Sequence, residues 1–243
     1  MNIETWTWGV LWAIVTLGLL GLPWLPAWAE WRRPTDASAL PASLPAHSMD
    51  LPPSLALADG AGFTELQGRE MRLGDGAWPP AIELAEPLER WQPPQGARPW
   101  GLGGWHIGRH LDIGAGQKVP CALVVRGRLR VHGPALIEGD LKARDELRLG
   151  PGTQVRGNVF CDGDIRLDTG CSISGLVMAE GTLYLAPGVV LGTALRPVSV
   201  CADRIRVQGP VRAHGSLHAR LGGDVLRAPP AERIFPPHPT DPV

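Results

Sequence analysis

The sequence is poor in aromatic residues other than tryptophan, with three phenylalanines and one tyrosine among 243 residues. It also lacks an excess of either charge, since 23 basic and 24 acidic residues give a formal net charge of −1. A nearly neutral chain has no long-range field that would steer a polyanion toward it. The motifs of the common DNA- and RNA-binding modules are missing as well. These absences argue against a nucleic-acid partner.

Cysteine is scarce, and its spacing does not suit a metal site. The four cysteines form no CxxC pair and no histidine-paired zinc pattern. Cys161 and Cys171 fall where the repeat described below expects inward-facing side chains. We therefore expect them to be small core residues rather than disulfide partners or metal ligands.

Signatures of catalysis are also missing. The sequence has no glycine-rich phosphate loop, nucleophile elbow or paired-carboxylate arrangement. We therefore expect no catalytic residue, no metal and no cofactor. The alternative is a β-solenoid enzyme of the hexapeptide acyltransferase or γ-carbonic anhydrase type, which needs a histidine base or three histidines on zinc. The candidates for that role are His106, His110, His132, His214 and His218.

Glycine and proline, in contrast, are abundant, with 31 and 25 residues. Each interior glycine costs a helix about 1 kcal/mol relative to alanine, so this composition argues against a helical bundle. Both residues favour sharp turns, which suits a chain of short strands.

The first 31 residues contain a long apolar run. No charged residue occurs from Thr5 to Ala29, and about 20 apolar residues are enough to span a hydrocarbon core. Arg32 and Arg33 follow the run, and positive residues stay on the cytoplasmic side. We predict a single-pass anchor in the cytoplasmic (inner) membrane over residues 1–31, with the remainder of the chain inside. Tryptophans stand at both ends of the run, as in an interfacial aromatic belt: Trp6, Trp8, Trp12, Trp24, Trp28 and Trp31.

A cleaved signal peptide is the competing interpretation of this run. Ala27-Trp28-Ala29 offers small residues for cleavage, but tryptophans crowd the site and the start of the chain carries no positive side chain. If cleavage occurred, the chain would be an exported β-helical surface protein.

Segments of low complexity flank the part of the chain that can form a core. Residues 32–60 are rich in proline and alanine and are interpreted as a linker. Residues 224–243 form a proline-rich C-terminal tail. Residues 61–104 are interpreted as an irregular segment. Their "MRLGDG", at 71–76, resembles "LRLGPG" from 147 onward, which makes the segment a possible cover for one end of the main domain.

From Leu111 onward the sequence repeats every eighteen residues. A fixed period of this kind indicates a repeat architecture. A four-residue insertion near residues 196–203 delays the last copy. The apolar pairs that recur are Leu111/Ile113, Leu129/Val131, Leu147/Leu149, Ile165/Leu167, Leu183/Leu185 and Ile205/Val207.

Each repeat contains a finer period of six residues. Apolar residues alternate with polar ones in short runs, which is the pattern of strands with one buried face. Glycine, proline or aspartate follows most runs, where the backbone must turn. Three strands and three corners per repeat predict an all-β, triangular, single-stranded β-helix of about six coils over residues 105–223. Bulky residues stand at a position that left-handed hexapeptide helices keep small, which favours right-handed winding.

The stretch from 111 to 221 resembles the bactofilins, which are polymer-forming bacterial cytoskeletal proteins. The resemblance rests on consecutive copies in "GDLKARDELRLGPGTQVRGNVFCDGDIRLDTGCSISGLVMAEGTLYLAPG", each with an apolar-x-Gly followed by a strand, as from Val155 to Cys161. It implies a right-handed β-helix that polymerises end to end without nucleotide, associates with membranes and acts as a scaffold for cell-wall or cell-shape machinery. The family pattern has a phenylalanine near the end of the last coil, where this sequence has Ala213.

The ends of a solenoid carry unpaired strand edges that can recruit a second copy. We expect docking through at least one end. The alternative is that residues 61–105 and the C-terminal tail cover the ends and leave a monomeric rod. The candidate assembly residues are Leu111 and Ile113 at one end and Ile205, Val207, Val211, Ala213 and Leu217 at the other.

Arginine recurs at one outward position of the repeat. Such a stripe could face anionic lipid or an acidic partner. The simpler interpretation, which we adopt, is a solvated face balanced by nearby acids: Asp140, Glu146, Asp164 and Asp168. The stripe consists of Arg130, Arg148, Arg166 and Arg206.

Overall fold

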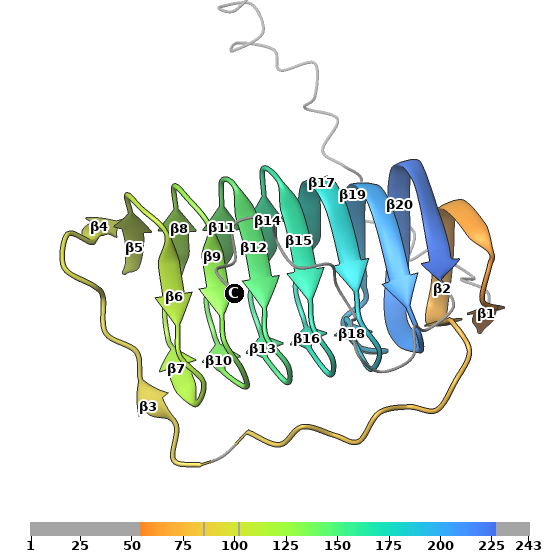
Figure 1. The fold of residues 1–243 in the computed structure, drawn as a ribbon, viewed down its shortest axis with the longest axis horizontal. Helices are drawn as coiled ribbons and strands as arrows, with labels where there is room; N and C mark the ends of the chain where they lie inside the picture. Colours follow the sequence, from red (N-terminus) through yellow and green to blue (C-terminus); the bar gives the residue numbers. More distant parts are fainter. Residues whose placement is uncertain (1–53, 85, 102, 227–243) are drawn as a thin grey trace, which may run out of the picture. The chain divides into compact units, whose positions relative to one another are not determined.

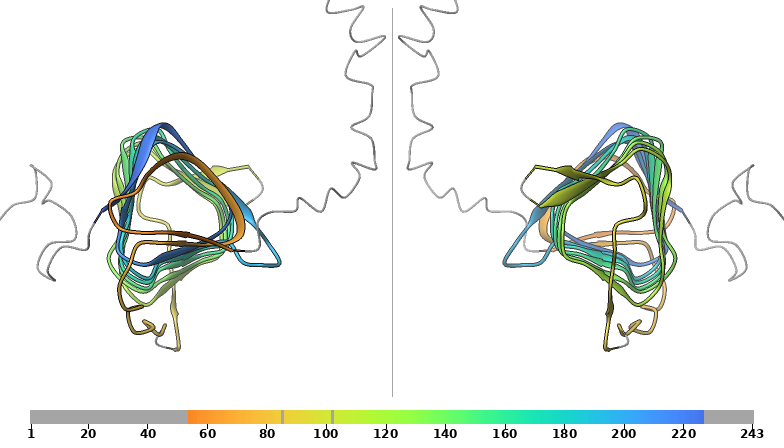
Figure 2. Two further views of the ribbon diagram at one scale, coloured as in Figure 1. Left: turned by 90° about the vertical axis from the view of Figure 1, so that its right-hand side faces the viewer. Right: turned by 90° about the vertical axis from the view of Figure 1, so that its left-hand side faces the viewer.

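The computed structural model describes residues 54–226 of the chain, except for Ala85 and Leu102. These residues form twenty β-strands. The strands stack into a rod with a triangular cross-section, as Figures 1 and 2 show. The prediction of an all-β solenoid with an eighteen-residue period is confirmed. The rod has about nine layers rather than the six expected, because residues before Leu111 contribute layers at both ends.

The three faces of the rod are built from different parts of each repeat. We name the faces in chain order: face A begins the repeat, face B follows it and face C completes it. Face A contains β6 (Leu111–Ile113), β9 (Leu129–Val131), β12 (Glu146–Leu149) and β15 (Asp164–Leu167). Face B contains β7 (Gln117–Val119), β10 (Leu136–Ile137), β13 (Gln154–Val155), β16 (Ser172–Ile173) and β18 (Val190–Leu191). Face C contains β5 (Gly104–Ile107), β8 (Leu123–Val125), β11 (Leu141–Ala143) and β14 (Val159–Cys161).

Three longer strands bend around corners near the C-terminal end of the rod. β17 (Val177–Leu185) and β19 (Val198–Gln208) run from face C to face A, and β20 (Val211–Leu226) passes over all three faces. In Figure 1 the face A strands lie on the side of the rod that faces the viewer, and they run downward. The chain returns on the far side while it advances to the right. This is the sense of a right-handed coil.

Parallel pairing in strict register carries the repeat from layer to layer. Leu147 of β12 pairs with Leu129 on one side and Ile165 on the other, each eighteen positions away. The predicted insertion shifts the next step, so that Leu183 pairs with Ile205. The inserted residues form a projecting loop closed by a bridge between Thr193 and Arg196. The insertion therefore lengthens one corner without interrupting the stack.

The core is a column of aliphatic side chains that point inward from every strand. Leu129, Leu147, Ile165 and Leu183 are all 0% exposed. Full burial of such a side chain stabilises the fold by about 1.5–3 kcal/mol. Because each inward residue packs against its equivalents above and below, the core stabilises the rod only when several turns stack.

The corner between faces A and B depends on glycine. Gly152, Gly170 and Gly188 have φ values of 70°, 70° and 79°, a region that residues with a Cβ atom rarely adopt. Their amides form a ladder along the rod: Gly152 N–H donates to the Thr169 carbonyl at 2.9 Å, and Gly188 N–H donates to the Pro210 carbonyl at 2.7 Å. The breaker residues seen in the sequence therefore mark real corners.

Candidate functional site: the ends of the rod and the arginine face

The C-terminal end of the rod is covered by a strand from the beginning of the described chain. β2 (Gly62–Leu73) runs antiparallel to β20 over all three faces. Phe63 lies opposite Gly223, Leu66 opposite Leu217 and Leu73 opposite Val211. A helical coil keeps its hand when the chain traverses it backwards, so β2 continues the solenoid as one further turn. The alternation of Leu66, Met71 and Leu73 supplies the inward side chains of this turn.

This arrangement changes the expected assembly surface. The residues that we expected at an open C-terminal edge are buried beneath the reversed turn or one layer further inside. Val211 and Leu217 are 0% exposed, and β2 occupies the outer edge of their strand. The outermost layer at this end is therefore β2, not β20. The residues concerned are Ile205, Val207, Val211, Ala213 and Leu217.

A short strand is added to part of this layer. β1 (Leu55–Leu57) pairs in parallel with residues 71–73 of β2 on face B. Residues 62–68 of β2 pair on one side only, with β20, within the described part of the chain. Four apolar side chains of this end layer pack on the core but are only partly buried: Leu55, Leu57, Phe63 and Leu66. The end thus combines an open strand edge with apolar surface.

The N-terminal end of the rod is covered differently. β3 (Glu89–Arg90) pairs in parallel with β7, and β4 (Arg98–Trp100) forms a hairpin with β5. Trp91 is 6% exposed and belongs to the core cluster, so its side chain packs on the core at this end. Trp100 is 53% exposed. This end therefore presents aromatic surface beside short strands.

The two candidate residues at the N-terminal end lie inside the core. Leu111 is 5% and Ile113 is 0% exposed. Their strand, β6, pairs with β9 and with no other strand of the described residues, so its outer backbone edge is open on face A. The backbone of residues 111–113, rather than these two side chains, is the part available for pairing.

A connecting segment, residues 74–88, joins the two covered ends; we call it the strap. In Figure 1 it runs along the lower edge of the rod from β2 to β3. Figure 2 places it at the corner between faces A and B. A Cβ atom on Gly152 would lie 2.5 Å from Ile82 Cγ2, and one on Gly188 would lie 2.4 Å from Pro79 Cγ. The glycine corner thus provides both the turn and the space in which the strap lies.

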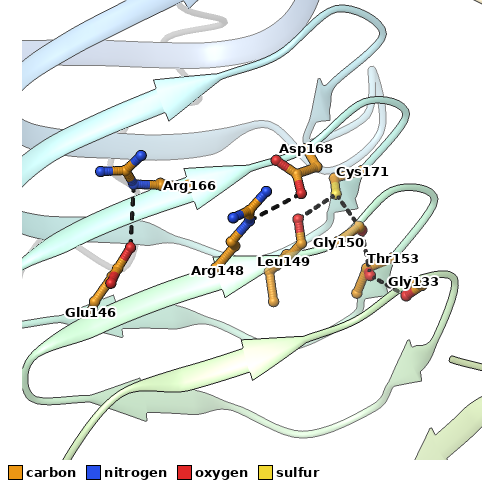
Figure 3. A network of polar contacts seen from close by, with 9 residues as sticks. All are labelled: Gly133, Glu146, Arg148, Leu149, Gly150, Thr153, Arg166, Asp168 and Cys171. Carbon is orange, nitrogen blue, oxygen red and sulfur yellow. Dashed lines mark hydrogen bonds and ion pairs between the residues drawn. The ribbon is translucent and has the colours of Figure 1, made fainter. Parts of the chain in front are cut away.

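The arginine stripe is not a free cationic surface. Arg148 Nε lies 3.2 Å from Asp168 Oδ2, and Arg166 Nε lies 3.2 Å from Glu146 Oε1. Figure 3 draws both pairs. The Arg166 guanidinium also stacks over the Tyr184 ring, 4.8 Å from its centroid. Arg206 is exposed. Of the acids that we expected to balance the stripe, Glu146 and Asp168 pair directly with it.

Asp168 is one of two polar residues that are buried among the described residues, with 8% of its surface exposed. Desolvation raises the pKa of its carboxyl group, and the charge of Arg148 opposes that rise. Asp140 and Asp164 have other roles, because each accepts a backbone N–H from the next turn, from Asn158 and from Thr182.

The buried thiol of Cys171 completes the network in Figure 3. Cys171 Sγ lies 3.2 Å from the Gly150 carbonyl, and the Thr153 hydroxyl donates to the carbonyl of Gly150 or Gly133, at 2.7 and 2.8 Å. Burial raises the pKa of the Cys171 thiol to about 12 and that of Cys161 to about 11. The four cysteines are free, and the prediction that Cys161 and Cys171 are core residues is confirmed.

The candidate histidines lie apart from one another, and each has different contacts. His132 Nε2 lies 3.0 Å from Asp112 Oδ1, and His110 Nδ1 accepts the Arg128 N–H at 2.8 Å. His214 Nδ1 contacts the Arg69 carbonyl at 2.6 Å. His106 lies on β5 and pairs with Arg98 in the hairpin. Within residues 54–226 no three histidine, cysteine or acidic side chains converge in the manner of a metal site.

One groove, of about 580 Å³, opens where faces C and A meet near the C-terminal end. It contains Met178, which is 47% exposed, and the bidentate ion pair between Asp203 and Arg220. His218 Nδ1 and Glu65 Oε1 face each other in it at 3.8 Å, which is too far for a direct hydrogen bond. The groove therefore holds no preformed acid–base pair.

We did not predict the end-layer residues Leu55, Leu57, Phe63 and Leu66 from the sequence. The available signal was the alternation in "LAL" and in "FTELQGREMRL".

The predicted membrane anchor, residues 1–31, and the tail from residue 227 onward lie outside the described residues. No helix among the residues that the structure describes is long and apolar enough to cross a membrane.

Comparison with known proteins gave no relatives. No family model, no curated protein and no solved structure matches this chain.

Proposed function

We propose that this chain is a non-enzymatic scaffold that assembles with further copies of itself through the ends of its β-helix. The observation that carries the proposal is the C-terminal end layer, where residues 62–68 of β2 have an open edge beside the partly buried Leu57 and Leu66. An unpaired edge next to apolar surface favours the addition of another strand. At the other end, the open edge of β6 and the exposed Trp100 offer a similar combination.

The resemblance to bactofilins supports the same function and adds two elements. A scaffold of that kind would position cell-envelope or cell-shape machinery, with a cell-wall-related protein as a partner. The apolar run in residues 1–31 would anchor the scaffold in the cytoplasmic membrane with the β-helix on the cytoplasmic side. Because β2 covers β20, the proposed joining surface is formed by β1 and β2 rather than by the last coil that contains Ala213.

The experiment is to compare assembly of the full-length chain with that of a matched pair of variants on one strand. Leu57→Lys places a charge on the apolar end, whereas Ala56→Lys places it on an exposed neighbouring position. Sedimentation velocity in detergent and negative-stain electron microscopy would follow assembly. We expect Leu57→Lys to shift the chain to a monomer and Ala56→Lys to assemble like the unmodified chain.

An unmodified chain that remains monomeric at high concentration would contradict end-to-end assembly. So would unchanged assembly of Leu57→Lys when circular dichroism shows the folded β-helix.

A further inference from the structure

Three side chains that can bind a soft metal ion lie in a row on the outer side of face C. Met178 of β17 pairs in register with Cys201 of β19, and Cys201 pairs with His218 of β20. Each of the three stands between two buried residues of its strand, so its own side chain points outward. Neighbouring strands lie about 4.8 Å apart, which places a thioether, a thiol and an imidazole side by side.

The same three residues line the groove where faces C and A meet. Of the two methionines among residues 54–226, Met71 is fully buried, whereas Met178 is 47% exposed. The His218 side chain is 38% exposed, and Cys201 is partly exposed. Exposed side chains can rotate without any change in the packing of the core. Met178 and His218 can therefore both turn toward the sulfur atom of Cys201, whose strand lies between theirs.

The reversed turn adds a carboxylate beside this row. Glu65 of β2 pairs in register with His218, and its Oε1 lies 3.8 Å from His218 Nδ1. A carboxylate that faces one ring nitrogen of a histidine favours the tautomer with the proton there and leaves the other nitrogen for a metal ion. Glu65 thus leaves Nε2 of His218 as the donor.

The kinds of donor select the ion. Thiolate and thioether sulfur favour copper(I), and imidazole also suits copper. Zinc is bound instead by cysteine, histidine and acidic side chains, and within residues 54–226 no three of these converge. We infer that this row is a copper(I) site, with Met178 Sδ, Cys201 Sγ and His218 Nε2 as ligands. The Cys201 thiol releases its proton to solvent when the ion binds.

Anaerobic titration of the full-length chain in detergent with copper(I) tests the site. Bathocuproine disulfonate, a chelator whose copper(I) complex is coloured, competes for the ion, so its absorbance reports how much copper the chain retains. We expect the chain to retain one equivalent of copper(I). Zinc sulfate at the same concentration should not displace it, because zinc gains little from a thioether ligand.

Substitution of the ligands tests the named residues. Cys201→Ser should abolish retention, because it removes the thiolate of the row. Met178→Leu and His218→Gln should each weaken retention at least about tenfold, since a metal–ligand bond worth about 1.4 kcal/mol already gives this factor. Cys121→Ser is the matched control and should bind copper like the unmodified chain, because Cys121 is also partly exposed but lies in the turn before β8. Circular dichroism verifies that each variant is folded.

A second measurement uses the unmodified chain alone. One equivalent of copper(I) should slow alkylation of Cys201 at least about tenfold, because the bound sulfur is no longer a free thiolate. Alkylation of Cys121 should keep its rate, and peptide mapping distinguishes the two sites. Neither measurement depends on the proposed assembly, so a chain that stays monomeric should bind copper as well as an assembled one.

Copper that Cys201→Ser retains as the unmodified chain does would place the ion elsewhere and overturn the inference. Unchanged retention by Met178→Leu or by His218→Gln would overturn the three-ligand site. Displacement of the copper by zinc, or equal protection of Cys121 and Cys201 from alkylation, would also refute it.

Discussion

His214 Nδ1 donates a hydrogen bond of 2.6 Å to the backbone carbonyl of Arg69, although 145 residues separate the two positions. A carbonyl oxygen only accepts, so the proton lies on Nδ1. The bond joins β2 to β20. This contact holds the reversed turn, β2, against the last coil of the solenoid.

Truncation of an inward side chain of β2 should destabilise the rod. Leu73 is fully buried against β20, so Leu73→Ala removes buried methyl groups and leaves a cavity that costs about 2–5 kcal/mol. Arg72→Ala on the same strand is the matched control, because the Arg72 side chain is 69% exposed. That change should stay within about 0.5 kcal/mol. Urea unfolding of the two variants measures the difference, and equal midpoints would show that β2 does not form part of the folded core.

Because of the strap, substitution by alanine should destabilise the rod more at Gly152 than at Gly116. Gly152 and Gly116 both have positive φ, at 70° and 73°. A Cβ atom on Gly152 meets Ile82, whereas one on Gly116 meets no heavy atom within 4 Å. Gly116→Ala should therefore cost about 1–2 kcal/mol of backbone strain, and Gly152→Ala should cost more.

The double variant Ile82→Ala/Gly152→Ala distinguishes the two contributions. Ile82→Ala removes Cγ2, the atom closest to the added methyl group, and leaves Cβ at 2.9 Å, so Gly152→Ala should cost less in this background than in the unmodified chain. Thermal or urea unfolding of the four proteins completes a double-mutant cycle. Additive effects would mean that the strap does not contact Gly152 in solution.

The cysteines should separate into two classes by reactivity. Cys161 and Cys171 are buried with pKa values of about 11 and 12, so almost no thiolate forms at pH 8. Cys121 and Cys201 are partly exposed. A thiol reagent at pH 8 should therefore modify Cys121 and Cys201 first, and the other two only on unfolding. Peptide mapping after brief alkylation identifies the sites, and early modification of Cys171 would contradict its burial.

Asp168 should give a characteristic pH dependence. Its pKa is raised in the folded state, mainly by desolvation, so the folded rod binds this proton more tightly than the unfolded chain does. Its contribution to stability is full below the unfolded pKa, near 3.8, and is lost as pH rises through the higher folded value. The unfolding free energy of the unmodified chain minus that of Asp168→Asn should therefore fall as pH increases from about 3.5.

Urea titrations of both proteins at several pH values give this difference directly. Subtraction cancels the other carboxyl groups, including Glu70 and Asp203, whose pKa values are lowered by Arg72 and Arg220 and which act in the opposite sense. A difference that rises with pH would show that the Arg148 ion pair outweighs burial at this site.

The repeat was predictable because its physical cause is local. Each layer places an aliphatic pair such as Leu147 and Leu149 directly on its equivalent, so the period and register were visible in the sequence. The number of layers was not. β2 runs backwards, and a reversed strand shows the same alternation as a forward one, so Leu66 and Leu73 gave no sign of direction.

The segments that cover the two ends of the rod are held by contacts that no sequence pattern indicates. Trp91 packs on the core at the N-terminal end without belonging to any repeat, and Ile82 lies at the glycine corner although it comes from a proline-rich segment. The arginine stripe was visible as a repeat. Its pairing was visible only in part, because the partner of Arg166, Glu146, comes from the preceding turn and that of Arg148, Asp168, from the following one.

Because β2 runs backwards, the first and last described residues lie at the same end of the rod. The Gly60 N–H donates to the carbonyl of Val225 at 2.7 Å, so the described chain enters and leaves at a single pole. The opposite pole, with Trp91 and Trp100, contains neither the first nor the last of the described residues. A label attached at Asp59 or Leu226 would therefore lie at the first pole and would leave the tryptophan pole accessible.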